Sequence, residues 1–288
     1  MTGQPAEPRA RLGHHSYGKT GVRLAKVERD GDLHTFHDLT VRLWLEGDFG
    51  PAFLAGDNST SLPTDTMRAT TYAFARDLPL AQTEVFLEAV GRRLLEVVPA
   101  ATTAHLDATV HSWERIPVEG QGHPHAFRGV MGDGTAEVAL TREEAATVTS
   151  GLTGLLVAKT AHSEYAGFLT DDYTVLAETN DRIMATSVDT TWTWLRPPAS
   201  YPLAREVVRR TLERVFATHH SLAVQHTLFA SGEAVLTAVP EIATITVVMP
   251  NRHHVPVDLT PFGRDNPNEV FVVPDRPYGV ISATVERT

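Results

Sequence analysis

The chain has 288 residues, 42% of them hydrophobic and 21% charged, which is enough for two globular domains that each bury a sizeable core. Its formal net charge of −10 argues against nucleic acid as a partner, because binding to a phosphate backbone requires a basic surface. The absence of cysteine excludes disulfides, thiolate metal sites, iron–sulfur clusters and a cysteine nucleophile.

The N-terminal region, residues 1–16, is polar and lacks the hydrophobic segment of a signal peptide. No apolar run approaches the roughly 20 residues that cross a bilayer. We therefore expect a flexible tail over 1–16, no membrane partner and a cytoplasmic location.

The first half of the chain predicts a long hairpin, from Tyr17 to Glu46, followed by helices and further strands. Asp30-Gly31 is a strong turn signal, and from residue 39 onward apolar and polar residues alternate as in a half-buried strand. In 83–98 the apolar residues fall on one helical face, and Pro99 ends the helix. The other expected elements are a helix over 65–76, strands over 104–115 and 124–131, and a second turn at Asp133-Gly134.

The second half repeats this order. Helices are expected over 201–217 and 222–237, with Ser200 and Ser221 as their N-caps. The expected strands are 152–160, 182–195, 241–249 and 278–287. Strands joined by short turns imply antiparallel sheets with the helices gathered on one face. The sequence therefore predicts an α+β protein of two tandem units, 17–145 and 146–288.

Histidine pairs raise the question of a metal. His253 and His254 directly follow an apolar run, but adjacent residues of a strand point to opposite faces, so such a pair does not supply two ligands to one metal. His123 and His125 could share a face, yet no third ligand stands at a recognisable spacing. We expect no metal. Sequence motifs for nucleotide cofactors and for triad hydrolases are also absent.

Five blocks of sequence carry a resemblance that composition does not explain. They are YGKTGVRLAKV (17–27), GDNSTSLPTDTMRATTYAFARD (56–77), GFLTDDYTVLAETNDRIMAT (167–186), SLAVQHTLF (221–229) and MPNRHH (249–254). In this order and spacing, over nearly the whole chain, they resemble the urate oxidase (uricase) family. The resemblance implies two tandem tunnelling-fold (T-fold) units, each an antiparallel sheet with two helices on one face. It also implies oxidation of urate by O2 and water to 5-hydroxyisourate and hydrogen peroxide, with no metal or organic cofactor.

The resemblance assigns a proton relay to three residues. Lys19 matches the family's catalytic lysine, Thr64 its partner threonine and His253 the histidine that completes the relay. The residue types suit this chemistry: a lysine becomes a base when burial or a nearby cation lowers its pKa, and a threonine hydroxyl can both accept and donate a proton. Histidine gains or loses a proton near neutral pH. At the HH pair we expect only His253 to reach the pocket and His254 to be structural or solvent-facing.

The resemblance also assigns the residues that hold urate. Arg182 and Gln225 match the pair that grips the urate edge, because a guanidinium fork holds two acceptors and an amide offers both a donor and an acceptor. Asn251 matches the asparagine above the urate plane, where O2 or water sits. The other matching pocket positions are Val224, through its backbone, with Asp65, Leu176 and Tyr165. Family members assemble as homotetramers in which Lys19 and Thr64 would meet Arg182 and Gln225 of a neighbouring chain.

Some positions depart from the family pattern. Tyr165 stands where a phenylalanine usually stacks on urate, and Arg68 and Ala69 replace a common Lys-Asn beside the catalytic threonine. The C-terminal TVERT is not a peroxisomal S-K-L-type address, which favours the cytoplasm. Two alternatives stay open at this point: a non-oxidising T-fold protein that binds a purine or pterin, and a metal-dependent enzyme that uses His123 and His125.

Overall fold

The computed structural model describes residues 10–288, so residues 1–9 of the expected tail lie outside the described part. The chain divides into two compact units. The first runs up to Glu28 and continues in Phe36–Thr109 and Glu137–Val148, and the second consists of Arg29–Thr35, Val110–Ala136 and Thr149–Thr288. No helix of residues 10–288 is long and apolar enough to span a membrane.

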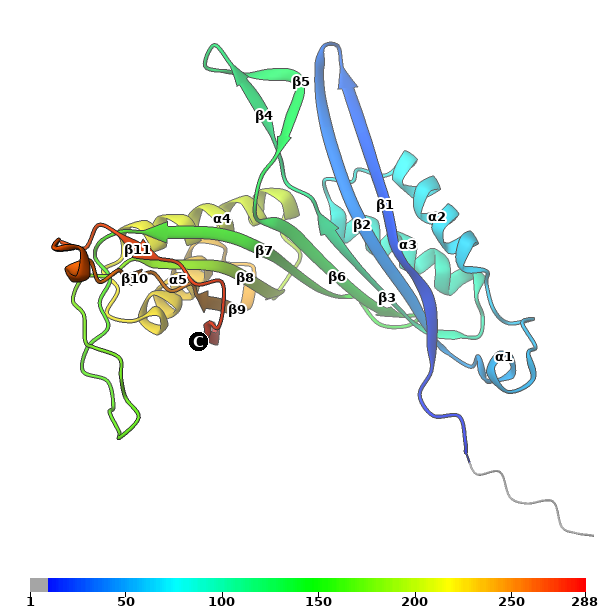
Figure 1. Cartoon of the computed structure of the whole chain (residues 1–288). Helices are drawn as coiled ribbons and strands as arrows, with labels where there is room; N and C mark the ends of the chain where they lie inside the picture. Colours follow the sequence, from blue (N-terminus) through cyan, green and yellow to red (C-terminus); the bar gives the residue numbers. More distant parts are fainter. Residues whose placement is uncertain (1–9) are drawn as a thin grey trace, which may run out of the picture. The chain divides into compact units, whose positions relative to one another are not determined.

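The first unit is built on a sheet whose strands follow the order β1-β2-β3-β6. Its strands are β1 (Ser16–Asp30), β2 (Leu33–Gly47), β3 (Ala101–Val110) and β6 (Asp133–Thr141). Its helices are α1 (Gly50–Ala55), α2 (Thr64–Asp77) and α3 (Thr83–Val97), drawn in light blue and cyan in Figure 1. Every second residue of β2 from Leu39 to Leu45 is buried, and so is the face of α3 that contains Phe86, Val90 and Leu94. The period-2 and period-3.6 patterns therefore bury one face of each element.

The second unit repeats the plan with the strand order β7-β8-β9-β12. Its strands are β7 (Thr147–Lys159), β8 (Met184–Trp194), β9 (Ile242–Asn251) and β12 (Gly279–Glu286), and its helices are α4 (Tyr201–Thr218) and α5 (Val224–Ala238). Neighbouring strands are antiparallel. Trp192 of β8 is fully buried in one core with Val208 of α4, Val235 of α5 and Ile245 of β9. The two helices lie together on one face of the sheet (Figure 1).

Two insertions and one long connection complete the chain. The hairpin β4 (Trp113–Val118) and β5 (Gln121–Gly129) stands between β3 and β6. The segment after β9 contains β10 (Val255–Pro256), the 3-10 turn η1 (Thr260–Phe262) and β11 (Phe271–Val272) before the chain enters β12. Between β7 and β8 the chain is held by two isolated bridges, Ser163 to Ser221 and Tyr165 to Thr179.

The α+β architecture and most of the expected elements are confirmed. The helices predicted over 65–76, 83–98 and 201–217 correspond to α2, α3 and α4. Ser200 caps α4, since its side chain accepts a hydrogen bond from the Leu203 N–H. The Asp30-Gly31 signal lies at the turn between β1 and β2, where Gly31 has a φ of 56°.

Two local predictions in the first half are wrong. Asp133-Gly134 opens β6 and makes no turn, because the Asp133 carboxylate accepts a hydrogen bond from the Ser112 N–H at 2.9 Å and contacts His111 at 3.0 Å. The hairpin turns instead at Glu119-Gly120, where both φ values are positive, at 51° and 81°. The strand predicted over 104–115 is consequently divided between β3 and β4.

Ser221 is not the N-cap of α5. The helix begins at Val224, with Ala223 in the capping position and no side-chain cap. The Ser221 backbone carbonyl accepts a hydrogen bond from the Glu164 N–H at 2.7 Å, while the Ser221 hydroxyl donates to the Ala223 carbonyl at 2.9 Å. Pairing with the 163–165 segment thus moves the start of the helix two residues along the chain.

Candidate active site

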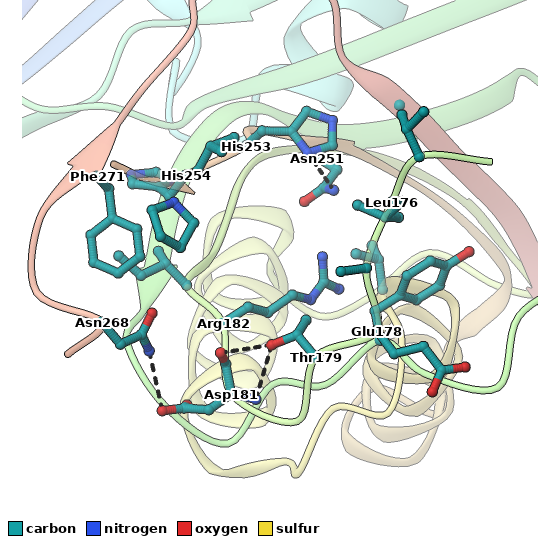
Figure 2. A pocket seen from close by; sticks show the side chains of 18 of the residues that line it. Leu176, Glu178, Thr179, Asp181, Arg182, Asn251, His253, His254, Asn268 and Phe271 are labelled. Atoms are coloured by element: carbon teal, nitrogen blue, oxygen red, sulfur yellow. Dashed lines mark hydrogen bonds between the residues drawn. The ribbon is translucent and has the colours of Figure 1, made fainter. Parts of the chain in front are cut away.

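A cavity of about 650 Å³ opens in the second unit, where three segments of the chain converge. These segments are the connection before β8, the beginning of α5, and the stretch from the end of β9 to β12 (Figure 2). Among the residues that line it are seven of the predicted site residues: Tyr165, Leu176, Arg182, Val224, Gln225, Asn251 and His253. Residues that are far apart in the sequence therefore share one pocket.

Arg182 is the central cation of this pocket. Its backbone N–H donates to the Ser163 carbonyl at 3.0 Å, and its guanidinium carbon lies 5.5 Å from the centroid of the Tyr165 ring. Burial lowers the pKa of Arg182, while interaction with Tyr165 acts in the opposite direction. Its Nε is buried and has no hydrogen-bond partner among residues 10–288. A buried, unpaired donor is costly, so this atom is suited to an acceptor supplied by a ligand.

A second cation lies close to Arg182. The ammonium of Lys159 donates to the His219 carbonyl at 2.7 Å. Burial and, second to it, the charge of Arg182 lower the pKa of Lys159. Arg182 and Lys159 thus bring two cations together in a chain that is acidic as a whole. This pair favours an anionic ligand, while the carboxylates of Glu178 and Asp181 also line the cavity.

Helix α5 presents its N-terminus to the cavity. Val224 and Gln225 are its first two residues, and no side chain in the described part of the chain caps the helix. The first N–H groups of a helix have no partner within the helix and carry its positive dipole end. The helix terminus therefore adds a preference for an anion beside Arg182.

Asn251 and His253 approach the cavity from the end of β9. Asn251 is held between two strands, paired with Thr186 of β8 and with Gly279 of β12. Its amide nitrogen lies 3.3 Å from the Nδ1 of His253. Because the amide nitrogen can only donate, Nδ1 accepts, and the proton of the neutral ring lies on Nε2.

His254 also lines the cavity, so the expectation that only His253 would reach the pocket is wrong. That expectation assumed strand geometry, in which neighbouring side chains point to opposite faces. The strand β9 ends at Asn251, and the chain that follows is irregular up to Val255. The His254 ring is held by a 3.0 Å hydrogen bond from Nδ1 to the Arg252 carbonyl.

Lys19, Thr64 and Asp65 belong to the first unit, whereas the residues that line the cavity all belong to the second. Lys19 lies on β1, and Thr64 and Asp65 are the first residues of α2. The Lys19 ammonium donates to the Asp65 carboxylate at 2.8 Å, and Arg68 lies 3.6 Å from the same oxygen. The hydrogen bond from Lys19 and then the charge of Arg68 lower the pKa of Asp65.

Several other residues of the cavity wall had no signal in the sequence. Glu178, Thr179, Asp181, Asn268 and Phe271 line it as well (Figure 2). They come from irregular segments, where neither periodicity nor motif spacing predicts which side chains converge. Within residues 10–288, no three histidine, cysteine, aspartate or glutamate side chains form a group suited to a metal ion.

The fold places the chain in a structural class. Its structure resembles the crystal structure of the uricase from Arthrobacter globiformis, with a TM-score of 0.90 and 42% identity over 97% of this chain and 96% of that one. The urate oxidase of Bacillus sp. TB-90 has the same fold, with a TM-score of 0.83 at 21% identity over 95% of this chain and 100% of that one. The chain is thus a T-fold protein built from two sheet-and-helix units.

The sequence comparisons define the family. The uricase family model matches residues 15–133 and 148–282. The uricase of Arthrobacter globiformis is 44% identical over 277 residues, which cover 96% of this chain and 90% of that protein. The uricase of Aspergillus flavus is 33% identical, covering 94% of this chain and 95% of that protein. The chain belongs to the uricase family.

Proposed function

We propose that this chain is a urate oxidase that converts urate, O2 and water into 5-hydroxyisourate and hydrogen peroxide. Family membership supports the activity. The structural observation that carries the proposal concerns Arg182: its Nε is buried and unpaired within the described residues, in a cavity that also contains Gln225 and the N-terminus of α5. This arrangement suits a flat anion with acceptors along its edge.

Urate binding is assigned to six residues of the cavity and to Thr64 and Asp65. Arg182 holds two acceptors of the urate edge with its planar fork, and the Gln225 amide pairs with a donor and an acceptor on another part of that edge. The Val224 backbone N–H contributes at the helix end. The ring of Tyr165, which lines the cavity beside Arg182, is assigned to stack on the substrate. Leu176 lines the site, and Asn251 is assigned to the position above the urate plane, where O2 or water sits.

The proton chemistry is assigned to Lys19, Thr64 and His253. Lys19 removes a proton from urate through the hydroxyl of Thr64, and His253 exchanges a proton through Nε2 on the other side. Proton removal converts urate into a dianion, which is electron-rich enough to transfer electrons to O2. The substrate itself therefore supplies the redox chemistry. The protein positions urate, deprotonates it and keeps bulk water away.

We further propose a homotetramer with active sites at subunit interfaces, built from T-fold units at 17–145 and 146–288. Lys19 and Thr64 of one chain would complete the pocket that contains Arg182 and Gln225 of a neighbour. The connection before β8 supports an interface, because Leu169, Tyr173 and Val175 are 96%, 89% and 98% exposed there. Apolar side chains exposed together are typical of interaction surfaces.

A cytoplasmic location completes the proposal. The chain contains no cysteine and so does not depend on an oxidising compartment for disulfides. Fractionation of cells that produce the chain tests this, with urate-degrading activity expected in the cytosolic fraction.

The activity itself is tested by following the near-UV absorbance of urate together with hydrogen peroxide formation. Loss of urate with one peroxide formed per urate is expected, and it should persist after exhaustive chelation. Arg182→Ala is the matched control for non-enzymatic oxidation. If the wild-type chain binds urate but leaves its absorbance unchanged in the presence of O2, the chain is a binding protein and the proposed activity is wrong.

A further inference from the structure

A hydrogen bond joins the turn that contains Arg182 to the long segment after β9. The side-chain amide of Asn268 donates to the Asp181 carboxylate at 3.3 Å, and both residues line the cavity (Figure 2). The segment 255–272, which we call the strap, also contributes Pro256 and Phe271 to the cavity wall. Asp181 immediately precedes the arginine that is assigned to urate.

The strap is organised so that Asn268 reaches Asp181. Both the nitrogen and the oxygen of the Asn266 side chain form hydrogen bonds within the strap. The nitrogen donates to the Val257 carbonyl at 2.9 Å and to the Val270 carbonyl at 2.7 Å. The oxygen accepts the N–H groups of residues 269 and 270, each at 3.0 Å. Asn268 itself has a φ of 63°, a left-handed conformation that asparagine tolerates far better than most residues. The position of Asn268 is therefore built into the strap.

Asp181 is held from its other side. The Thr179 hydroxyl donates to the Asp181 carbonyl at 2.9 Å, and the Asp181 N–H donates back to that hydroxyl at 3.3 Å. The next residue, Arg182, is anchored through its backbone to Ser163 at 3.0 Å. The Arg182 side chain lies beside the Tyr165 ring, and its Nε is unpaired within residues 10–288. The position of its guanidinium consequently depends on the backbone of this turn.

We propose that Asp181 and Asn268 are positioning residues for urate binding: their hydrogen bond ties the strap to the Arg182 turn and orders both before urate arrives. The inference rests on the proposed function. If the Arg182 turn is already ordered, it loses less conformational freedom when urate binds. Breaking the hydrogen bond between Asp181 and Asn268 should therefore weaken urate binding more than it slows the chemical step. Because one exposed hydrogen bond is involved, a loss of about threefold to tenfold in affinity is expected.

The test uses the fact that the donor and the acceptor of this hydrogen bond can be swapped by substitution. Asn268→Asp places two carboxylates together, and Asn268→Gly removes the side chain while keeping the left-handed backbone accessible. The double variant Asp181→Asn/Asn268→Asp restores a donor and an acceptor in reversed order. Glu269→Gln, at the neighbouring exposed position of the strap, is the matched control. The dissociation constant of urate is measured without O2, when no turnover occurs, and kcat is measured with O2.

Both single variants are expected to raise the dissociation constant with kcat changed by less than about twofold, the double variant to recover most of the affinity, and the control to match the wild type. Unchanged affinity in Asn268→Asp overturns the inference, as does a double variant no better than the single ones. A fall in kcat and melting temperature without weaker binding also overturns it, since that marks a purely structural role. If the wild type binds and oxidises no urate, the proposed function fails first and this inference with it.

Discussion

At the scale of single residues, Arg182 is the position whose chemistry is most specific. Its Nε is buried and unpaired within residues 10–288, so this N–H and a second one of the guanidinium can donate to two acceptors of a ligand. A lysine retains the charge but has no planar fork. Arg182→Lys should therefore raise the KM for urate by about tenfold or more, the value of one charge-assisted hydrogen bond. Steady-state kinetics over a wide urate range measure this, and a KM within about twofold of the wild type would show that a point charge is sufficient.

Lys19 should behave in the opposite way. It is assigned to proton removal, and general-base catalysis typically contributes about a hundredfold to ten-thousandfold to the rate. Lys19→Met should therefore lower kcat on this scale while changing KM far less. Lys26, on the same strand, is the matched control, because its ammonium donates to the Leu78 carbonyl at 2.8 Å and has no assigned role in the reaction. Lys26→Met should retain kcat, and an equal loss in both variants would mean that Lys19 acts through stability.

The two adjacent histidines show where reasoning from residue spacing fails. The family blocks pointed to His253, and the structure brings it to the cavity with Asn251. The expectation for His254 rested on strand alternation, which applies only while the backbone remains extended and paired. The strand ends two residues before His253, so nothing in the sequence pattern constrains which way either ring points.

At the scale of elements, the sequence predicted the helices and strands whose apolar residues recur with a regular period. The hairpin of β1 and β2 and the helices α2, α3 and α4 follow from alternation, helical faces and a serine cap. It failed where a side chain overrides local turn chemistry: Asp133 uses its carboxylate on Ser112, and the turn moves to Glu119-Gly120. The strap was not predicted, because its order comes from the side chain of Asn266 and from no repeating pattern.

The joint between α4 and α5 predicts a pH dependence of stability. His219 ends α4, its Nδ1 contacts the Thr227 hydroxyl of α5 at 3.1 Å, and its ring centroid lies 4.3 Å from that of His226. Burial, followed by the charges of His226, Lys159 and His220, lowers the pKa of His219 from its ordinary 6.5. The unfolded chain therefore binds this proton at a higher pH than the folded chain does. Stability should fall as pH decreases below about 6.5 and level off below the folded pKa.

This prediction is checked by urea unfolding between about pH 7.5 and pH 5, a range that spans the ordinary histidine pKa. In His219→Gln, the urea concentration at the unfolding midpoint should decrease less over that range. The substitution removes the imidazole whose protonation favours the unfolded chain. His125→Gln, on the exposed hairpin of β4 and β5, is the matched control and should retain the wild-type slope. If the urea midpoint depends on pH in the same way in the wild type and in His219→Gln, other groups are responsible for the loss of stability at acidic pH.

At the scale of the whole molecule, the assigned active-site residues are divided between the two units. Arg182, Gln225, Asn251 and His253 lie in the second, and Lys19 and Thr64 in the first. Exposed apolar side chains of the connection before β8, among them Leu169 and Val175, give a physical reason for association with another copy. In a symmetric dimer, each chain contributes the same residues to the site of its partner, so two equivalent sites result.

Subunit complementation tests this arrangement. Lys19→Met and Arg182→Ala chains should each be inactive alone, because each lacks one essential group at every site. In a mixed dimer with shared sites, one site carries both defects and the other carries none. Half of randomly mixed dimers are heterodimers, so roughly a quarter of all sites should be intact and about that fraction of wild-type activity should return. The two variants, one of them tagged, are refolded together, the tag is used to verify that mixed species form, and urate loss by the whole mixture is measured against each variant refolded alone. Mixed oligomers that form but recover no activity would mean that each site is built within a single chain.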